Sequence, residues 1–368
     1  MEQDKYRKVI SRLEGPAVIG SPEAICYTTG FYTTARRPGQ IGRMYGVITE
    51  AGVTLVSPAN WAEEVMRQTA GNPWVRVIPW DPYPKSIGEH LIDALREGGG
   101  FSEIGIELSG MDILAMKALE EGFPEAVIKD ITADLNRARM IKTPQEIQAL
   151  KKSAALASKA MEYAKTLVRP GIREFEMAAE LEYFMRRGGS DGTPFAMKAL
   201  SGPNTAVTIN IPGQRAVREG DLVLFDFGAV VDHYASDWTR TFVCGKASRE
   251  QKELYQLVRT IEQECIRMIK PGLLIQSLMD KAFETASSHP FGRWFKPYLG
   301  HSIGLSSQEW PALEPKAFGC LEENMVITIE PGIYIPEMGG IRMEDEVLVT
   351  REGYQILTGL ENEIFEIY

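Results

Sequence analysis

The sequence predicts a smaller α/β domain followed by a larger α+β domain that contains an internal repeat. Short apolar runs alternate with segments of helical periodicity from about residue 16 to residue 130. Beyond residue 140, a helix–helix–strand–strand pattern occurs twice. The chain of 368 residues is also longer than one hydrophobic core usually supports, so two domains are expected.

The first domain contains several apolar runs of strand length. Between them lie the segments 61–70 and 88–98, in which apolar residues recur at helical spacing. Strands that alternate with helices favour an α/β domain with its own core. The expected strands are 16–20, 44–49, 53–58, 75–80 and 103–108.

The boundary between the domains is predicted near residues 130–142, and we place it between the ranges 1–135 and 136–368. A short helix is expected here, followed by a helix start in the sequence KTPQE, with Pro144 in the first turn. One long helix follows and ends at the Pro-Gly pair that begins at Pro170.

The second domain repeats one order of features. Each copy has a helix end, a basic residue, a Pro-Gly pair, a branched apolar residue and a second helix. The two Pro-Gly pairs begin at Pro170 and Pro271, which lie 101 residues apart (271 − 170 = 101). This spacing predicts two structural copies of one unit.

Each copy also supplies two acidic residues next to apolar, strand-like runs. Asp226 corresponds to Glu330 (330 − 226 = 104), and Asp237 corresponds to Glu344 (344 − 237 = 107). Asp226 directly follows the apolar run 222–225, where an unpaired carboxylate is costly to bury. The two copies therefore predict a pseudo-two-fold sheet in which four carboxylates face one centre.

Hairpins would bring the two acids of each copy together. The interval between Asp226 and Asp237 is odd, so these residues could not share a face of one continuous strand. A hairpin through the sequence VVDHY, with Asp232 and His233 in its loop, would place them on neighbouring strands. The segment between the other two acids, PGIYIPEMGGIR, has Pro and Gly residues that also suit a connection between strands.

Four carboxylates that face one point repel one another, and without cations some of them would have to keep a proton. His301 lies at the end of an apolar segment and can add an imidazole nitrogen to the set. Oxygen-rich donors with one nitrogen suit divalent ions, so the pattern predicts a site for two of them. Each acid alone is more often a strand-end or turn residue. The matched offsets in two copies favour the metal site.

Composition and charge argue against several classes of function. The formal net charge of −10 disfavours a nucleic-acid partner, because phosphate binding depends on a basic surface. No apolar run approaches the roughly 18 residues of a membrane span, and the charged start lacks the core of a signal peptide, so a cytoplasmic protein is expected. The four cysteines form no CxxC pair and are expected to be reduced.

Several segments resemble the metal-ligand motifs of the M24 metallopeptidase family, whose fold is called pita-bread. The resemblance implies a C-terminal pita-bread domain behind a creatinase-like N-terminal domain. The leading domain and the sequence RMIKTPQEI at 139–147 resemble the prolidase and creatinase branch. The segments with the ligand motifs are FDFGAVVDHYASDWTRTFV (225–243), GHSIGL (300–305), ITIEPGIYIP (327–336) and GGIRMEDEVLV (339–349).

The resemblance also implies a ligand set for two divalent ions, with manganese or cobalt expected and zinc or iron as alternatives. Asp226 would chelate one ion. Asp237 and Glu344 would bridge both ions, and His301 with Glu330 would complete the shell of the second.

The residues on the substrate side depart from the family pattern. The family usually reads HGIGLxxHExP, whereas this chain reads HSIGLSSQEWP, so Gln308 stands where a histidine is usual. A second histidine is usual seven residues after the glycine of an SGxN turn, where this chain has Ile209. Gln308 can form hydrogen bonds but cannot carry a proton, and Ile209 can do neither.

The catalytic residues that the resemblance implies are Glu330, Gln308 and Arg342. Glu330 would relay a proton to the leaving nitrogen, and Gln308 would contact the substrate. Arg342 and Arg240 each lie near a bridging acid in the sequence, and they would orient it.

The leading functional prediction is a dinuclear metallohydrolase that cleaves Xaa-Pro bonds in small peptides, as a dipeptidase or an aminopeptidase. The resemblance also implies a homodimer. One alternative is a hydrolase of non-peptide amides or amidines, of the creatinase or ectoine hydrolase type. Another is a pita-bread binding module without catalysis. The presence of all five ligands counts against the metal-free creatinase mechanism and against an inactive module.

Overall fold

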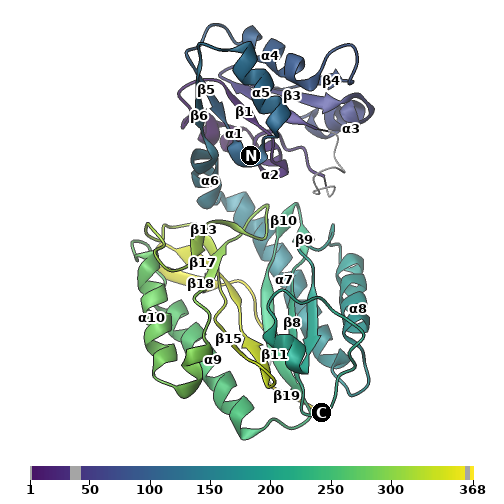
Figure 1. The fold of residues 1–368 in the computed structure, drawn as a ribbon, viewed down its shortest axis with the longest axis vertical. Helices are drawn as coiled ribbons and strands as arrows, with labels where there is room; N and C mark the ends of the chain where they lie inside the picture. The colour runs from purple at the N-terminus through teal and green to yellow at the C-terminus, as the bar shows by residue number, and fades with distance from the viewer. Residues whose placement is uncertain (1, 34–42, 361–364) are drawn as a thin grey trace. The chain divides into compact units, whose positions relative to one another are not determined.

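The structure is a computed structural model that describes residues 2–33, 43–360 and 365–368. The chain divides into two compact units, residues 1–139 and residues 140–368 (Figure 1). The predicted domain boundary between 135 and 136 lies inside helix α6 (Thr132–Met140). Among the described helices, none has both the length and the apolar character that crossing a membrane requires.

The first unit is built around a mixed six-stranded sheet. Its strands are β1 (Ala17–Ile19), β2 (Tyr45–Thr49), β3 (Gly52–Pro58), β4 (Val75–Trp80), β5 (Glu103–Ile106) and β6 (Val127–Asp130). Their order is β4-β3-β2-β1-β5-β6, and β1 pairs parallel with β5 and antiparallel with β2. The predicted α/β domain is confirmed, and all five expected strands are present.

The helices of the first unit are α1 (Glu2–Ile10), α2 (Pro22–Thr29), α3 (Ala59–Thr69), α4 (Ile87–Glu97), α5 (Ile113–Gly122) and α6. The two helices that the sequence predicted correspond to α3 and α4. Leu91 and Leu95 of α4 are fully buried against apolar residues of the sheet, such as Val47 and Ile104. This apolar face explains why helical spacing could be recognised there.

The second unit begins with the long helix that the sequence predicted, α7 (Pro144–Leu167). Thr143 caps it: its side chain accepts a hydrogen bond from the backbone N–H of Glu146, and the Glu146 side chain accepts one from the backbone N–H of Thr143. Pro144 occupies the first turn, where a missing N–H costs nothing. The predicted helix start is confirmed.

The internal repeat of the second unit is also confirmed. The first copy runs from α7 and α8 (Glu174–Arg187) to β11, and the second from α9 (Arg249–Met268) and α10 (Ile275–Ser287) to β17. Gly171 and Gly272 have φ angles of 89° and 84°, a left-handed conformation that favours glycine, so both Pro-Gly turns need it. Figure 1 shows α8 and α10 on opposite sides of this unit, with β8 and β15 between them.

The strands of the second unit form two larger sheets and two short hairpins. The larger sheets have the orders β19-β11-β8-β7 and β13-β12-β14-β17-β18, and the hairpins are β9–β10 and β15–β16. The strands are β7 (Lys198–Ser201), β8 (Leu222–Phe227), β9 (Val230–Val231), β10 (Tyr234–Ala235), β11 (Trp238–Cys244), β12 (Gly300–Ser302), β13 (Glu309–Leu313), β14 (Val326–Ile329), β15 (Gly332–Ile335), β16 (Gly339–Arg342), β17 (Asp345–Thr350), β18 (Gly353–Ile356) and β19 (Glu366–Ile367).

Strand β8 shows how the core directs an acid toward the centre of the unit. Val223, Phe225 and Phe227 belong to the core cluster that contains residues of α7 and α8. Because side chains alternate along a strand, Asp226 projects from the opposite face of β8. The apolar side chains next to Asp226 in the sequence thus fix its direction.

Candidate metal centre

The acids of the first copy are brought together by the predicted hairpin. Strands β8 and β11 pair antiparallel, with Asp226 opposite Thr239, and Asp237 immediately precedes β11. The β9–β10 hairpin lies between them, and Asp232 and His233 form its turn with φ angles of 50° and 74°. Asp232 is exposed there and forms an ion pair with Lys152 at 2.6 Å. Both residues therefore lie in the turn that the sequence predicted.

The second copy repeats this arrangement. Strands β14 and β17 pair antiparallel, with Ile329 opposite Asp345. Glu330 follows β14 directly, Glu344 directly precedes β17, and the β15–β16 hairpin lies between them. The predicted connection between these two strands is thus present as well.

His301 reaches the same place from β12. Its backbone N–H donates to Thr328 Oγ1 at 3.1 Å, and its ring Nδ1 lies 3.0 Å from the backbone carbonyl oxygen of Ser302. A carbonyl oxygen only accepts, so Nδ1 carries the hydrogen. In the neutral ring Nε2 then has a free lone pair, and it lies 3.2 Å from Glu330 Oε1 and 3.6 Å from Asp237 Oδ2.

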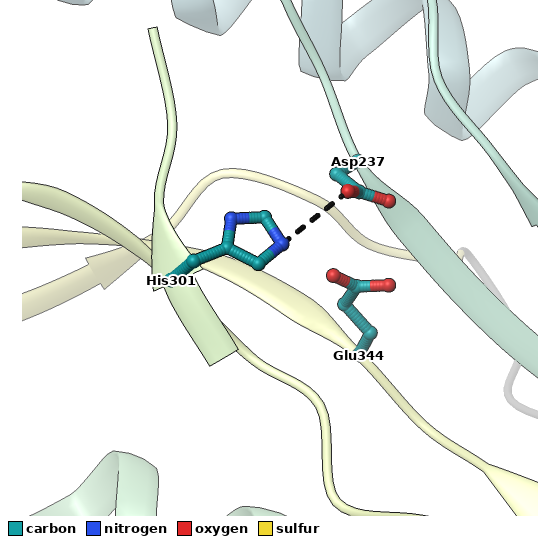
Figure 2. Close-up of side chains that lie close together, drawn as sticks. All are labelled: Asp237, His301 and Glu344. Atoms are coloured by element: carbon teal, nitrogen blue, oxygen red, sulfur yellow. Dashed lines mark ion pairs between the residues drawn. The ribbon is translucent and has the colours of Figure 1, made fainter. Parts of the chain in front are cut away.

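Three of the predicted ligands form a compact cluster. Asp237, His301 and Glu344 are buried, and each offers a ligand atom within 4.8 Å of the others. Figure 2 shows the three side chains pointing toward one another. Thr239 Oγ1 donates to Glu344 Oε2 at 2.7 Å. Within the described part of the chain, the buried Oε1 atom of Glu344 has no hydrogen-bond partner.

The crowding of acids perturbs the ionisation of this cluster. Burial, followed by the charges of Glu330 and Asp226, raises the pKa of Glu344 to about 8. Burial and the charge of Glu344 also raise the pKa of Asp237 well above its ordinary value. For His301, burial acts in the opposite direction, but Glu330 and Glu344 raise its pKa. The neighbouring side chains therefore do not supply enough positive charge to keep all of these carboxyl groups ionised.

Asp226 is in a different electrostatic state. Lys198 Nζ lies 2.6 Å from Asp226 Oδ2, and Arg342 Nη2 donates to the same oxygen. Burial alone would raise the pKa of Asp226, but Arg342 and Lys198 lower it below its ordinary value. Asp226 is therefore already paired with cationic side chains of the protein.

Glu330 is the most accessible of the four acids. It is only partly buried, and Thr328 Oγ1 lies 3.4 Å from its Oε1 atom. Arg342 Nε lies 4.0 Å from the other carboxylate oxygen, Oε2. Glu330 therefore contacts His301 and is also partly accessible to solvent.

All five predicted ligands line one cavity of about 790 Å³. Gln308 and Ile209 also line it, and both are exposed. The cavity is large enough for a ligand of the size of a small peptide, because ligand pockets usually have volumes of about 300–1,000 Å³. The structure thus brings the predicted ligands and both substrate-side positions to one space.

The two arginines contact other groups than the sequence suggested. Arg342 binds Asp226 rather than a bridging acid, and its Nη1 donates to Tyr334 Oη at 2.8 Å. Arg240 donates to the backbone carbonyl of Glu344 at 2.8 Å and to the carboxylate of Asp345 at 3.0 Å. Arg240 thus supports the backbone that carries a predicted ligand.

Lys198 is the residue of the site that sequence reasoning missed. It stands in the segment FAMKALSG, where it is a cation within an otherwise apolar strand. That break in the pattern was the available signal, since a buried-sheet strand rarely carries a lysine without a partner.

The residues of the cluster fit a divalent ion. Asp237 and Glu344 supply carboxylate oxygens, and the pKa of each carboxyl group is raised. Among the residues that the structure describes, none forms a hydrogen bond with the buried Oε1 atom of Glu344. His301 presents Nε2 in the tautomer that a metal ligand requires, because its other nitrogen is held by a backbone carbonyl. Oxygen donors with one imidazole suit the divalent metals.

Two family models match the chain. The model described as metallopeptidase family M24 matches residues 148–351. The model described as the creatinase/prolidase N-terminal domain matches residues 15–141.

Individual proteins give the same result. An Xaa-Pro dipeptidase of Pyrococcus furiosus is 39% identical over 237 residues, which cover 64% of this chain and 67% of that protein. The structure of an Xaa-Pro dipeptidase from Bacillus anthracis has a TM-score of 0.89 at 27% identity and full coverage of both chains. The structure of a prolidase from Pyrococcus horikoshii has a TM-score of 0.87 at 31% identity, covering 98% of this chain and 99% of that one.

These matches extend over both units and confirm the predicted pita-bread fold with its leading α/β domain. The chain belongs to metallopeptidase family M24, in the group whose members carry a creatinase/prolidase N-terminal domain.

Proposed function

We propose that the protein is a divalent-metal-dependent hydrolase that cleaves the amide bond before proline in small peptides, as a dipeptidase or an aminopeptidase. One observation carries the proposal: the Asp237–His301–Glu344 cluster opens into the cavity that also holds Glu330. Metal ligands and a further carboxylate at one cavity provide the groups that amide hydrolysis requires.

The relatives support the choice of bond. The Pyrococcus furiosus relative is named an Xaa-Pro dipeptidase, and the Pyrococcus horikoshii structure is named a prolidase. We extend this substrate class to the present chain as part of the proposal. A homodimer is also part of it, on the strength of the family resemblance.

In the proposed mechanism, Asp237, His301 and Glu344 would hold the metal. A divalent ion bound there would supply a nucleophile from water at neutral pH and would polarise the substrate carbonyl. Glu330, which is partly exposed to the cavity, accepts the proton of the attacking water and donates it to the leaving nitrogen. Arg342 orients the carboxylate of Asp226 beside this centre.

Manganese and cobalt are the metals we expect, and zinc and iron are alternatives. Two ions per chain is the number that the family resemblance predicts, with Asp226 as a ligand of the first. The proposed chemistry itself requires one ion at the Asp237–His301–Glu344 cluster.

A hydrolysis screen tests the proposal. The purified protein would be loaded with manganese or cobalt and offered Xaa-Pro dipeptides, longer Xaa-Pro peptides, the matching Xaa-Ala peptides, and small cyclic or guanidino amides. We expect metal-dependent release of proline or of a proline-led peptide, and little cleavage of the Xaa-Ala controls. Absence of cleavage of every proline peptide in the presence of metal would contradict the proposal.

A second candidate, a hydrolase of non-peptide amides, is favoured by Gln308 and Ile209. Neither side chain can carry a proton, although both line the cavity at positions where the peptidase pattern has histidine. The variants Gln308→His and Gln308→His with Ile209→His separate the two candidates.

A positioned acid–base group contributes about 10²–10⁴-fold to a rate, so the double variant should raise kcat/KM for Xaa-Pro peptides if they are the substrates. If the site serves another amide, the same changes should damage that reaction and leave Xaa-Pro cleavage negligible. A wild type that cleaves Xaa-Pro peptides rapidly and gains nothing from histidine would show that these positions do not limit the reaction.

A further inference from the structure

Lys198 introduces a positive charge at the place where the family resemblance puts a divalent ion. The residue lies on β7, which pairs antiparallel with β8, and Lys198 stands directly opposite Asp226 in that register. Its Nζ atom is 2.6 Å from Asp226 Oδ2, within charge-assisted hydrogen-bond distance. The pairing of these two sheet strands therefore places Lys198 beside Asp226.

The contact is sheltered from water. The side chain of Lys198 is 23% exposed and that of Asp226 is 5% exposed. The Nζ atom also lies 5.7 Å from the centre of the Phe195 ring, a distance at which an aromatic face attracts a cation. Because such a pair is poorly screened, its attraction exceeds that of a surface salt bridge.

Arg342 binds the same oxygen of Asp226 as Lys198 does. A divalent ion that used this carboxylate would have to compete with both cations or displace one of them. Arg342 is itself held by Tyr334 Oη at 2.8 Å and is buried, so Lys198 is the partner that could move. The first ion site is consequently the one that the protein itself obstructs.

The net charge of the four acids and their two cationic partners also argues against a second divalent ion. Asp226, Asp237, Glu330 and Glu344 carry four negative charges when ionised, and the two cations in contact with Asp226 offset two of them. One divalent ion neutralises the two negative charges that remain. A second divalent ion would make the centre positive overall, and like charges at such distances repel strongly.

We propose that Lys198, together with Arg342, supplies the positive charge that one of the two metal ions would otherwise supply, so that the chain binds a single divalent ion tightly, at the Asp237–His301–Glu344 cluster. Any second ion, at Asp226, binds more weakly by about 10- to 100-fold or more, the range over which residues next to metal ligands alter affinity. This inference rests on the proposed function, because it concerns the same centre.

Metal stoichiometry tests the inference without recourse to activity. Metal-free wild type, Lys198→Met and Lys296→Met would be titrated with manganese by calorimetry, and bound metal would be counted by elemental analysis after desalting. Methionine keeps the length of the lysine stem and removes its charge. Lys296 is the matched control, because it lines the same cavity and has no ion pair among the described residues. Manganese electron paramagnetic resonance distinguishes an isolated ion from an exchange-coupled pair.

We expect one tightly bound ion in the wild type and in Lys296→Met, with the spectrum of isolated manganese. Lys198→Met should gain a second ion, with an affinity 10- to 100-fold above any second site of the wild type, and an exchange-coupled spectrum.

Two tight, coupled ions in the wild type would overturn the inference and leave the proposed function intact. An unchanged single ion in correctly folded Lys198→Met would also overturn it. A wild type that binds no ion would overturn both. Asp226→Asn gives an independent check, since it should retain the tight ion in this account and should lose one of two ions if the centre is dinuclear.

Discussion

The two copies of the repeat place their acids at equivalent positions but in different electrostatic surroundings. In the first copy, Asp226 is bound by Lys198 and Arg342. Its counterpart in the second copy, Glu330, instead contacts His301 at 3.2 Å, and it is more exposed than Asp226 in the cavity that both acids line. Matching backbone geometry therefore does not make matching sites, because the residues around each acid decide which cation it binds.

The other member of each pair behaves alike in both copies. Asp237 and Glu344 each precede the returning strand, each is buried, and each has a raised pKa. Both belong to the cluster with His301. We therefore expect Asp237 and Glu344 to act alike, as ligands of the proposed ion, and Asp226 and Glu330 to act differently from each other.

The largest expected effect is the difference in metal binding and kcat/KM between the variants Glu344→Gln and Asp226→Asn. Glu344→Gln should abolish tight metal binding and lower kcat/KM by about 10²–10³-fold, as the loss of a charge-stabilising group in an active site does. Asp226→Asn should cost much less. Asp232→Asn is the control, because this exposed acid lies in the turn of the β9–β10 hairpin, pairs with Lys152 and is not among the residues that line the cavity. Equal losses of metal binding and of kcat/KM in Asp226→Asn and Glu344→Gln would contradict the proposed difference between the two copies.

The copies also differ in their ion pairs, because Lys142–Glu309 is buried and Lys152–Asp232 is exposed, and their contributions to the free energy of unfolding can be compared. Lys142 Nζ lies 3.1 Å from Glu309 Oε2 and 3.2 Å from Ser302 Oγ, beside His301, and its side chain is fully buried. Lys142→Met removes a buried cation from the carboxylate of Glu309, and this should lower the free energy of unfolding by about 3–5 kcal/mol.

Lys152→Met is the matched control, because it breaks an exposed pair with Asp232 on the first copy. It should cost at most about 1 kcal/mol in urea or guanidinium denaturation. Similar costs for the two variants would mean that burial does not distinguish these pairs.

The sequence was sufficient for the parts of the fold and site that depend on periodicity and spacing. The repeat, both hairpin connections and the start of α7 could be predicted, because each rests on local residue order. Helix α2 could not be recognised, since residues from Ala24 to Thr29 are all buried and leave no polar face to mark the helical period.

The contacts of Asp226 could not be predicted for a different reason. Lys198 meets Asp226 through the register of β7 against β8, and a hydrophobic pattern does not specify that register across 28 residues. Arg342 likewise lies near Glu344 in the sequence, but it binds the acid of the other copy. Sequence proximity suggested the wrong partner because hairpins redirect their side chains.

The pH dependence of metal stabilisation is a smaller effect with a defined sign. In the metal-free protein, the pKa of Glu344 rises from 4.5 to about 8 on folding, so stability falls as the pH rises between these values. His301, whose folded pKa is also raised, loses its contribution in the same direction. The lowered pKa of Asp226 acts only at lower pH, near or below its ordinary value of 3.8.

Metal binding requires deprotonated ligands, so the rise in Tm on adding manganese should be larger at pH 8 than at pH 6. A difference of several degrees is expected, because 1 kcal/mol corresponds to roughly 2–4 °C in a domain of 150–250 residues. Differential scanning calorimetry of the wild type and Glu344→Gln would measure it. A Tm shift that is equal at both pH values, or larger at pH 6, would contradict the assignment.

The central claim is that one ion at the Asp237–His301–Glu344 cluster enables hydrolysis before proline. The most direct test is kcat/KM of the metal-stripped protein for an Xaa-Pro dipeptide, measured as manganese is added in fractions of an equivalent. The account predicts negligible activity without metal, a rise that is complete near one equivalent per chain, and no rise in Glu344→Gln. Hydrolysis that is independent of added metal, or none at saturating metal, would contradict it.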